Sequence, residues 1–167
     1  MTDVLDLPAL AAILPELILV LGAMVLLMVG AARSGASAAI GGLSILLLVA
    51  AGVVLAFAPS GKVLAFHGSF VLDDYARFLK ILALIGSAVA ILMSIEFLGA
   101  VGRERFEYPV LILLSTAGML VLVSAADLIA LYLGMELMSL ALYVIAAIDR
   151  DNARSSEAGL KYLARNR

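Results

Sequence analysis

Long apolar segments, separated by short polar breaks, make up most of the chain. A transmembrane helix needs about 20 predominantly apolar residues, and the sequence contains five segments near this length. Most of the breaks are short, so consecutive helices are expected to run antiparallel. The pattern therefore predicts an all-α polytopic membrane protein, an up-and-down bundle with transmembrane helices at residues 14–32, 36–58, 75–99, 108–123 and 127–148.

The break between the second and third helices has a different pattern. Residues 59–74, PSGKVLAFHGSFVLDD, contain Pro, Gly and alternating apolar residues. This pattern predicts a loop outside the membrane with short extended pieces. His67 lies in the loop without a second ligand type beside it, so it is expected to be an exposed loop residue rather than a metal ligand.

Polar residues near the helix ends predict where the first and third helices begin. Pro15 suits the first turn of a helix, and Glu16 beside it would lie at the positive end of the helix dipole. Arg77 and Lys80 fall in the first turns of the third helix. Their long side chains are expected to extend to the lipid headgroups.

The last two helices carry start signals of their own. Ser124, three residues before Asp127, forms an acidic variant of the capping box at the start of the fifth helix. Ser155 or Ser156 is expected to cap a sixth helix. The segment that follows, EAGLKYLARNR, is too short and too charged to span a membrane. The sixth helix is therefore predicted to be truncated, with residues 164–167 as an atypical tail.

The composition confines the chain to the membrane class. It is 65% hydrophobic and 14% charged, well outside the range of soluble domains. A net charge of −2 gives no indication of nucleic-acid binding. The absence of cysteine excludes disulfides, thiolate metal sites and cysteine-ligated iron–sulfur clusters within the chain. The first eight residues, MTDVLDLP, carry no Lys or Arg, so the first apolar segment is expected to be a retained helix rather than a cleaved signal peptide.

The distribution of Lys and Arg predicts the orientation in the membrane. Cytoplasmic loops carry more Lys and Arg than outer loops. With the N-terminus outside, the inner loops hold five basic residues and the outer side holds Lys62, Arg77 and Lys80. The expected topology therefore has the N-terminus and residues 59–74 outside, and it places these residues inside: Arg33, Arg103, Arg105, Arg150 and Arg154.

Glu136 is the one charged residue in the segment LIALYLGMELMSLALYVIAAI, residues 128–148. A carboxylate at the centre of a span costs about 2.5–3.5 kcal/mol on insertion scales. Tyr132, Glu136, Ser139 and Tyr143 recur at i, i+4, i+7 and i+11, which places them in one stripe along a helix. The other face is apolar and suited to lipid or close packing, with Leu131, Met135, Leu142 and Ala146.

Two interpretations of Glu136 remain open at this point. The carboxyl can be a hydrogen-bonded strut between helices, or a titratable site on an ion or proton path, which is the usual role of an ionisable residue inside the membrane. Lys161 also has two interpretations. It follows Glu157 by four residues and can form an ordinary helical ion pair with it, or it can relay protons between the inner aqueous phase and Glu136.

Several motifs together resemble a known family. The segments LYLGMELMSLALYVIAA and RDNARSSEAGLKY are similar to the fifth helix and the following loop of subunit N of bacterial proton-pumping NADH–quinone oxidoreductase, respiratory complex I. LPELILVLGAMVLL resembles the first helix of that family, and FVLDDYARFLKIL resembles the entry into its third. The resemblance covers residues 10–163, and the match around Glu157 and Lys161 favours subunit N over the other antiporter-like subunits.

The resemblance implies a role in proton translocation coupled to electron transfer from NADH to quinone. It assigns the essential glutamate of the family to Glu136 and its lysine near the start of the sixth helix to Lys161. It implies other membrane-arm subunits and the lipid bilayer of the bacterial inner membrane as partners. No nucleophile cluster, phosphate-binding loop or metal-ligand spacing is present. The resemblance implies FMN, iron–sulfur clusters and quinone in partner subunits, and no cofactor is expected in this chain.

Family members continue through further helices that carry the buried lysines partnering the glutamate. The chain by itself is therefore expected to be inactive. Two alternatives are a component of a related multi-subunit cation/proton antiporter, against which the segment RSSEAGLKY argues, and a non-conducting membrane scaffold in which Glu136 only joins helices.

Overall fold

The computed structural model describes residues 7–32, 37–58, 61–101, 105–148 and 153–165. These residues form six α-helices and one short hairpin. Five of the helices are long and apolar enough to cross a membrane, which confirms the predicted all-α architecture. The elements are α1 (Leu7–Ala32), α2 (Ser37–Phe57), β1 (Val63–Ala65), a 3₁₀ turn (Phe66–Gly68), β2 (Phe70–Leu72), α3 (Asp74–Val101), α4 (Glu107–Ser124), α5 (Leu128–Ala146) and α6 (Ala153–Arg165).

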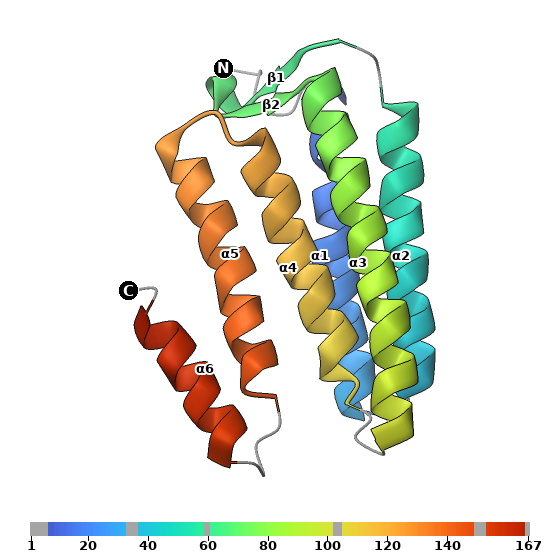
Figure 1. The fold of residues 1–167 in the computed structure, drawn as a ribbon. Helices are drawn as coiled ribbons and strands as arrows, with labels where there is room; N and C mark the ends of the chain where they lie inside the picture. The colour runs from blue at the N-terminus through green and yellow to red at the C-terminus, as the bar shows by residue number, and fades with distance from the viewer. Residues whose placement is uncertain (1–6, 33–36, 59–60, 102–104, 149–152, 166–167) are drawn as a thin grey trace.

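The five long helices form an up-and-down bundle (Figure 1). α1 packs against α2 and α4, α3 packs against α2 and α4, and α5 packs against α4 and α6. α4 is the most enclosed, with 56% of its most apolar 18-residue stretch buried, whereas the corresponding figure for α5 is 11%. α5 is therefore attached to the bundle by one face, and most of its surface is uncovered in this chain.

The outside of the bundle is lined by exposed apolar side chains. Large apolar residues are exposed along α1, α2, α3 and α5, among them Met28, Phe57, Phe78, Met93 and Leu128. A soluble monomer rarely exposes contiguous apolar surface on this scale, whereas a bilayer solvates it. The chain is a multi-pass membrane protein.

The hairpin covers one end of the bundle (Figure 1). β1 and β2 pair antiparallel, with Val63 opposite Leu72 and Ala65 opposite Phe70. Phe66 and Gly68 in the intervening turn both have positive φ, at 51° and 93°. The loop predicted from residues 59–74 is thus confirmed in its short extended pieces.

Two predictions at the helix starts were wrong. α1 begins at Leu7, so Pro15 lies inside the helix rather than in its first turn. Pro8 occupies the first turn instead, where its missing N–H costs little. The interior Pro15 is tolerated because neighbouring helices compensate for a lost backbone hydrogen bond in transmembrane helices. Glu16 is consequently buried in the bundle, and the dipole interpretation of its position fails.

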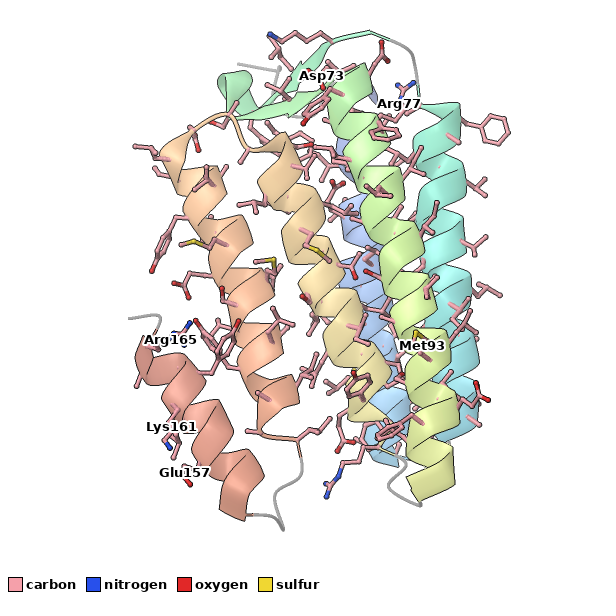
Figure 2. All side chains as sticks on the ribbon, viewed as in Figure 1. Asp73, Arg77, Met93, Glu157, Lys161 and Arg165 are labelled. Carbon is pink, nitrogen blue, oxygen red and sulfur yellow. The ribbon has the colours of Figure 1, made fainter. Side chains whose placement is uncertain are left out.

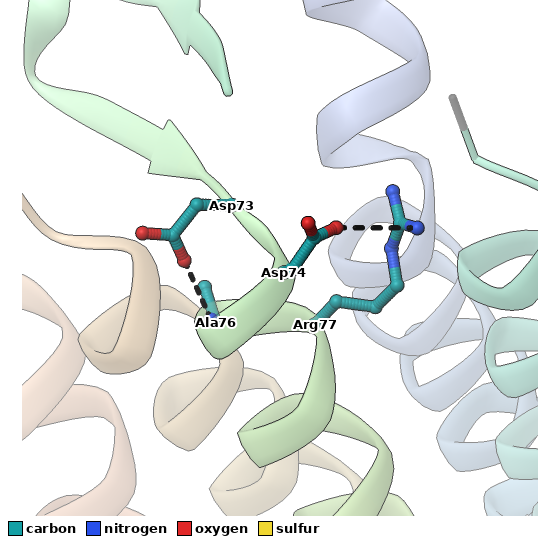
Figure 3. A network of polar contacts seen from close by, with 4 residues as sticks. All are labelled: Asp73, Asp74, Ala76 and Arg77. Atoms are coloured by element: carbon teal, nitrogen blue, oxygen red, sulfur yellow. Dashed lines mark hydrogen bonds and ion pairs between the residues drawn. The ribbon is translucent and has the colours of Figure 1, made fainter. Parts of the chain in front are cut away.

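Lys80 does not reach the headgroups. Its side chain is fully buried, because the position of Lys80 on α3 faces α1. Arg77, one turn earlier, is mostly buried and pairs with the exposed Asp74, with 3.8 Å between Nη1 and Oδ1. Figure 3 shows this pair at the start of α3, where Asp73 accepts a hydrogen bond from the Ala76 N–H at 2.7 Å. Asp73 thereby satisfies a free N–H at the helix start.

The starts of α5 and α6 also differ from the predicted caps. Ser124 is the last residue of α4, and Asp127 itself is the N-cap of α5, accepting a hydrogen bond from the Ala130 N–H at 2.6 Å. α6 begins at Ala153, ahead of both serines. The predicted orientation stays a prediction, and three of its residues, Arg33, Arg103 and Arg150, lie outside the described residues. Residues 166 and 167 of the predicted tail also lie outside them, whereas residues 164 and 165 end α6.

The cap on α5 should depend on pH. The hydrogen bonds from Ser69 and from the Ala130 N–H hold the pKa of Asp127 below its usual range. Since the folded pKa is depressed, the stabilising effect is complete above the unfolded pKa, about 4, and is lost as the pH falls through the lower folded pKa. Asp127→Ala should therefore speed amide exchange at residues 128–131, whereas Asp127→Asn should retain protection without the acid dependence. Equal exchange in Asp127→Ala and wild type would contradict the cap.

Candidate functional site

The polar stripe on α5 lies opposite the face that contacts α4. Gly134 and Ala141, two turns apart, are the buried residues of α5. At 100° per residue, Glu136 stands about 200° round the helix from Gly134. At the same angle per residue, the other three stripe residues also stand on the side of the helix opposite Gly134: Tyr132, Ser139 and Tyr143. The helical spacing thus puts the stripe on the side of α5 away from the rest of the five-helix bundle.

The stripe is predicted to face neighbouring helices, with Met135 and Leu142 more accessible to lipid, and the exposures within this chain alone do not follow that order. Tyr132 is 56% exposed, whereas Met135 is 40% exposed. Leu142 is partly buried and lines a groove between α3, α4 and α5. The physical reason is that, in the part of the chain that the structure describes, α4 makes the extensive contact with α5 and the side of α5 opposite α4 is covered only near its end by α6. That the stripe faces helices in a complete assembly stays a prediction.

α6 approaches one end of the stripe. The rings of Tyr143 on α5 and Tyr162 on α6 meet edge to face, with centroids 5.2 Å apart and an angle of 76° between the planes. This geometry is favourable for aromatic pairs. α6 therefore covers the stripe near Tyr143, and Tyr132 at the other end stays exposed.

Lys161 forms the predicted helical ion pair. Its Nζ lies 2.6 Å from Oε1 of Glu157, and the two side chains are 75% and 61% exposed. Figure 2 shows both residues on α6. Glu136 is on α5 and is partly exposed, and no contact between Lys161 and Glu136 is present among the described residues. The arrangement fits the ordinary ion pair, and a relay role for Lys161 stays a prediction.

α4 and α5 approach each other at two glycines. A Cβ built on Gly118 would lie 2.6 Å from the backbone N of Met138, and a Cβ built on Gly134 would lie 2.8 Å from the backbone N of Leu122. Real Cβ atoms do not come this close to backbone. The two glycines therefore set the distance between α4 and the helix that carries Glu136, as small residues do in membrane helix pairs.

A second ionisable cluster was missed by the sequence reasoning. Lys80 Nζ on α3 donates to Oε1 of Glu16 on α1 at 2.5 Å, and the two side chains are 0% and 5% exposed. The ammonium also lies 4.6 Å from the centroid of the Phe70 ring on β2, a cation–π contact. The sequence did contain a signal, because Lys80 is in helical register with the buried residues Ala76, Leu84, Ser87 and Ile91.

Among the described residues, no three His, Cys, Asp or Glu side chains gather closely enough to hold a metal ion. Glu136 on α5 and Glu16 on α1 both lie within helices long and apolar enough to span a membrane. Each places a carboxyl group in the interior of the membrane, where an ionised carboxylate without a balancing charge is costly.

The sequence is similar to two described families. Residues 4–96 match the family described as NAD(P)H-quinone oxidoreductase subunit 2 N-terminal. Residues 125–167 match the family described as NADH:quinone oxidoreductase/Mrp antiporter, TM. The first match covers more than half of the chain, and the second begins at the end of α4 and includes all of α5.

Curated relatives agree with these families. NADH-quinone oxidoreductase subunit N of Azorhizobium caulinodans is 52% identical over 157 residues, which cover 93% of this chain and 33% of that protein. The subunit N of Parvibaculum lavamentivorans is 51% identical over 152 residues, covering 89% of this chain and 31% of that protein. The chain thus spans about a third of the length of these relatives.

A solved structure shares the fold. A chain of the respiratory complex I from Thermus thermophilus with bound aureothin aligns with a TM-score of 0.71 and 26% identity, covering 90% of this chain and 32% of that one. The order of apolar helices, the hairpin between α2 and α3 and the helix that carries Glu136 are thus accompanied by similarity in sequence and in fold. The chain belongs to the NADH–quinone oxidoreductase subunit N family and corresponds to its N-terminal third.

Proposed function

We propose that this chain is part of a membrane-arm subunit that translocates protons, coupled to electron transfer from NADH to quinone. Other membrane-arm subunits of the oxidoreductase would be its protein partners. The observation that carries the proposal is the position of Glu136, midway along a transmembrane helix and in one stripe with Tyr132, Ser139 and Tyr143. A carboxyl group in this position is retained at a cost of a few kcal/mol, about 2.5–3.5 on insertion scales.

Glu136 is the proposed proton-carrying group. A carboxyl inside a membrane can be neutral when protonated and ionised when a cation approaches, so it can accept and release a proton as its surroundings change. The stripe lies on the side of α5 that this chain leaves largely uncovered, so further helices could complete a polar track there. Lys161, at the inner end under the predicted topology, would exchange protons with the aqueous phase.

Electron transfer would take place elsewhere. The chain contributes no cysteine and one histidine, and FMN, iron–sulfur clusters and quinone would be bound by partner subunits. The isolated chain is proposed to conduct no protons, since Glu136 has no buried cationic partner among the described residues and its ionised form is too costly without one.

A cation/proton antiporter component is the second candidate. The description of the family matched by residues 125–167 names both the quinone oxidoreductase and the Mrp antiporter. The matched segment includes the helix that carries Glu136. The match of residues 4–96 to a quinone oxidoreductase family favours the first candidate.

Substitution of Glu136 in the complete subunit, assembled in its complex, tests the proposal. Glu136→Gln preserves shape and hydrogen bonding but removes the titratable proton. NADH-driven quinone reduction should fall severely while the amount of assembled complex is unchanged, and Glu136→Asp should retain part of the activity because the carboxyl is kept. Glu96→Gln, an exposed carboxyl on α3, is the matched control and should behave as wild type. Full activity in Glu136→Gln would leave only the strut interpretation.

A further inference from the structure

In the Glu16–Lys80 pair, only one of the two carboxylate oxygens of Glu16 accepts a hydrogen bond from a described residue. Oε1 of Glu16 accepts the Lys80 ammonium at 2.5 Å, whereas the buried Oε2 has no hydrogen-bond partner among the described residues. An unsatisfied buried carboxylate oxygen is costly. Lys80 lies about 9 Å into the helix from Asp74, at 1.5 Å per residue. The pair is therefore inside the membrane-spanning part of the bundle, near the hairpin end.

Few other charges act on this pair. α2 carries no charged residue, and the described part of α1 carries only Glu16. On α3, Asp74 and Arg77 pair with each other at the helix start. The remaining charged or titratable groups described on elements packed against the pair lie at the ends of the bundle: Lys62, Asp73, Tyr75, Glu96, Arg105, Glu107, Tyr108 and Asp127. Lys80 is thus the cation that balances Glu16.

Phe70 connects the pair to the start of α5. Its ring lies against the Lys80 ammonium, and its backbone forms a bridge with Ala125, just before α5. Next to this bridge, the Ala126 N–H donates to the Ser69 carbonyl at 2.9 Å, and Asp127 caps the helix. A continuous set of contacts therefore runs from the buried pair through β2 to α5, the helix that carries Glu136.

We propose that Glu16 and Lys80 form a second protonatable site inside the membrane, whose charge state is transmitted through Phe70 to the start of α5. The ligand is a proton, which adds to Glu16 and converts the carboxylate to a neutral acid. Lys80 keeps its own proton, so the cluster changes from zero to one net positive charge. An unbalanced ammonium in the membrane interior is strongly unfavourable.

The ammonium can relieve this cost by moving toward the nearest polar surface. A lysine side chain can extend along apolar neighbours to place its charge in water, and the near surface here is the hairpin end. The Phe70 ring lies on the ammonium, so this movement displaces β2. Since β2 is bonded to the residues before α5, the start of α5 moves with it. This inference goes beyond the proposed function and does not require Glu136 to carry protons.

A distance measurement on the chain tests the transmission. The chain has no cysteine, so spin labels can be placed at Phe57→Cys on α2, away from the network, and at Ile129→Cys at the start of α5, whose movement is to be measured. Both side chains are exposed. In lipid nanodiscs at neutral pH, the two labels on a chain with Glu16 and Lys80 intact should give one narrow distance distribution. Acidification should shift or broaden it, and Glu16→Gln should show the shifted distribution already at neutral pH, with no further change in acid.

Two control variants make the result specific. The double variant Glu16→Gln/Lys80→Met has no buried charge to balance, so its distribution should match that of the wild type at neutral pH and stay there in acid. Since Asp127 still titrates in the double variant, a shift caused by the α5 cap would persist in it. Glu96→Gln removes an exposed carboxyl from the same helix and should have no effect.

Infrared difference spectra between acid and neutral pH test the proton site itself. The wild type should show a band of a protonated, buried carboxyl that is lost in Glu16→Gln and kept in Glu96→Gln. Absence of this band overturns the site, and an unshifted distance in folded Glu16→Gln overturns the transmission. If Glu16→Gln fails to fold, the wild type and the double variant are compared in acid, and identical behaviour of the two overturns the inference.

Discussion

Glu16→Leu is expected to destabilise the chain by about 3–5 kcal/mol, the usual result of removing one partner of a buried ion pair. The substitution leaves the Lys80 ammonium fully buried and without its carboxylate. Lys80→Leu should cost less, because a carboxyl left alone can take up a proton and become neutral. Unfolding in mixed micelles with an ionic detergent, followed by circular dichroism, measures these differences.

The double variant Glu16→Leu/Lys80→Leu separates two causes of the loss. Replacing a whole buried pair by apolar residues is often neutral or stabilising, so the double variant should recover most of the stability lost in Glu16→Leu. Glu157→Gln is the matched control, since it breaks the exposed pair with Lys161 and should cost at most about 1 kcal/mol. A Glu16→Leu variant as stable as wild type would show that the pair does not hold α1 and α3 together.

Gly118→Ala is expected to force α4 and α5 apart. The new Cβ would meet the backbone N of Met138 at 2.6 Å and the backbone O of Gly134 at 2.9 Å, and backbone atoms cannot rotate away as side chains can. Overpacking of this kind costs about 1–3 kcal/mol, occasionally more, against a gain of up to about 1 kcal/mol in helix propensity. Gly118→Val should cost more than Gly118→Ala.

Gly86→Ala on α3 is the matched control for this prediction. It makes the same change within a transmembrane helix at a position with open space around the new Cβ, so it should be neutral or stabilising. Spin labels on α4 and α5 should record a larger separation in Gly118→Ala and none in Gly86→Ala. Equal stability and equal distances in the two variants would contradict the close glycine contact.

The five spans could be predicted because the length of an apolar run is a local property of the sequence. The loop between α2 and α3, with its short extended pieces, followed from its Pro, Gly and alternating residues for the same reason, whereas the antiparallel pairing of those pieces is seen in the structure. The start of α1 could not be fixed in this way, because Pro8 and Pro15 both offer a first-turn proline and burial of Glu16 in the bundle decides between them.

The candidate sites depend on contacts that local patterns do not contain. The spacing from Tyr132 to Tyr143 predicted one stripe, but the small residues Gly134 and Ala141 decide which face of α5 meets α4. The Glu16–Lys80 pair joins residues 64 positions apart. A lysine two turns into a helix looks the same in sequence whether it reaches the headgroups or a buried carboxylate. The arrangement of α1 and α3 in the bundle, which brings Glu16 to Lys80, decides between the two.

Proton pumping by the complete complex with Glu136→Gln tests the central claim most directly. Membrane vesicles containing the variant, energised with NADH, are compared with wild type at equal amounts of assembled complex, and acidification of the vesicle interior is recorded together with quinone reduction. If Glu136 carries protons, pumping and quinone reduction fall together, and Glu136→Asp recovers part of both. Pumping at the wild-type rate in Glu136→Gln, whose amide satisfies the same hydrogen-bonding neighbours, would contradict the proton-carrying role and leave Glu136 as a link between helices.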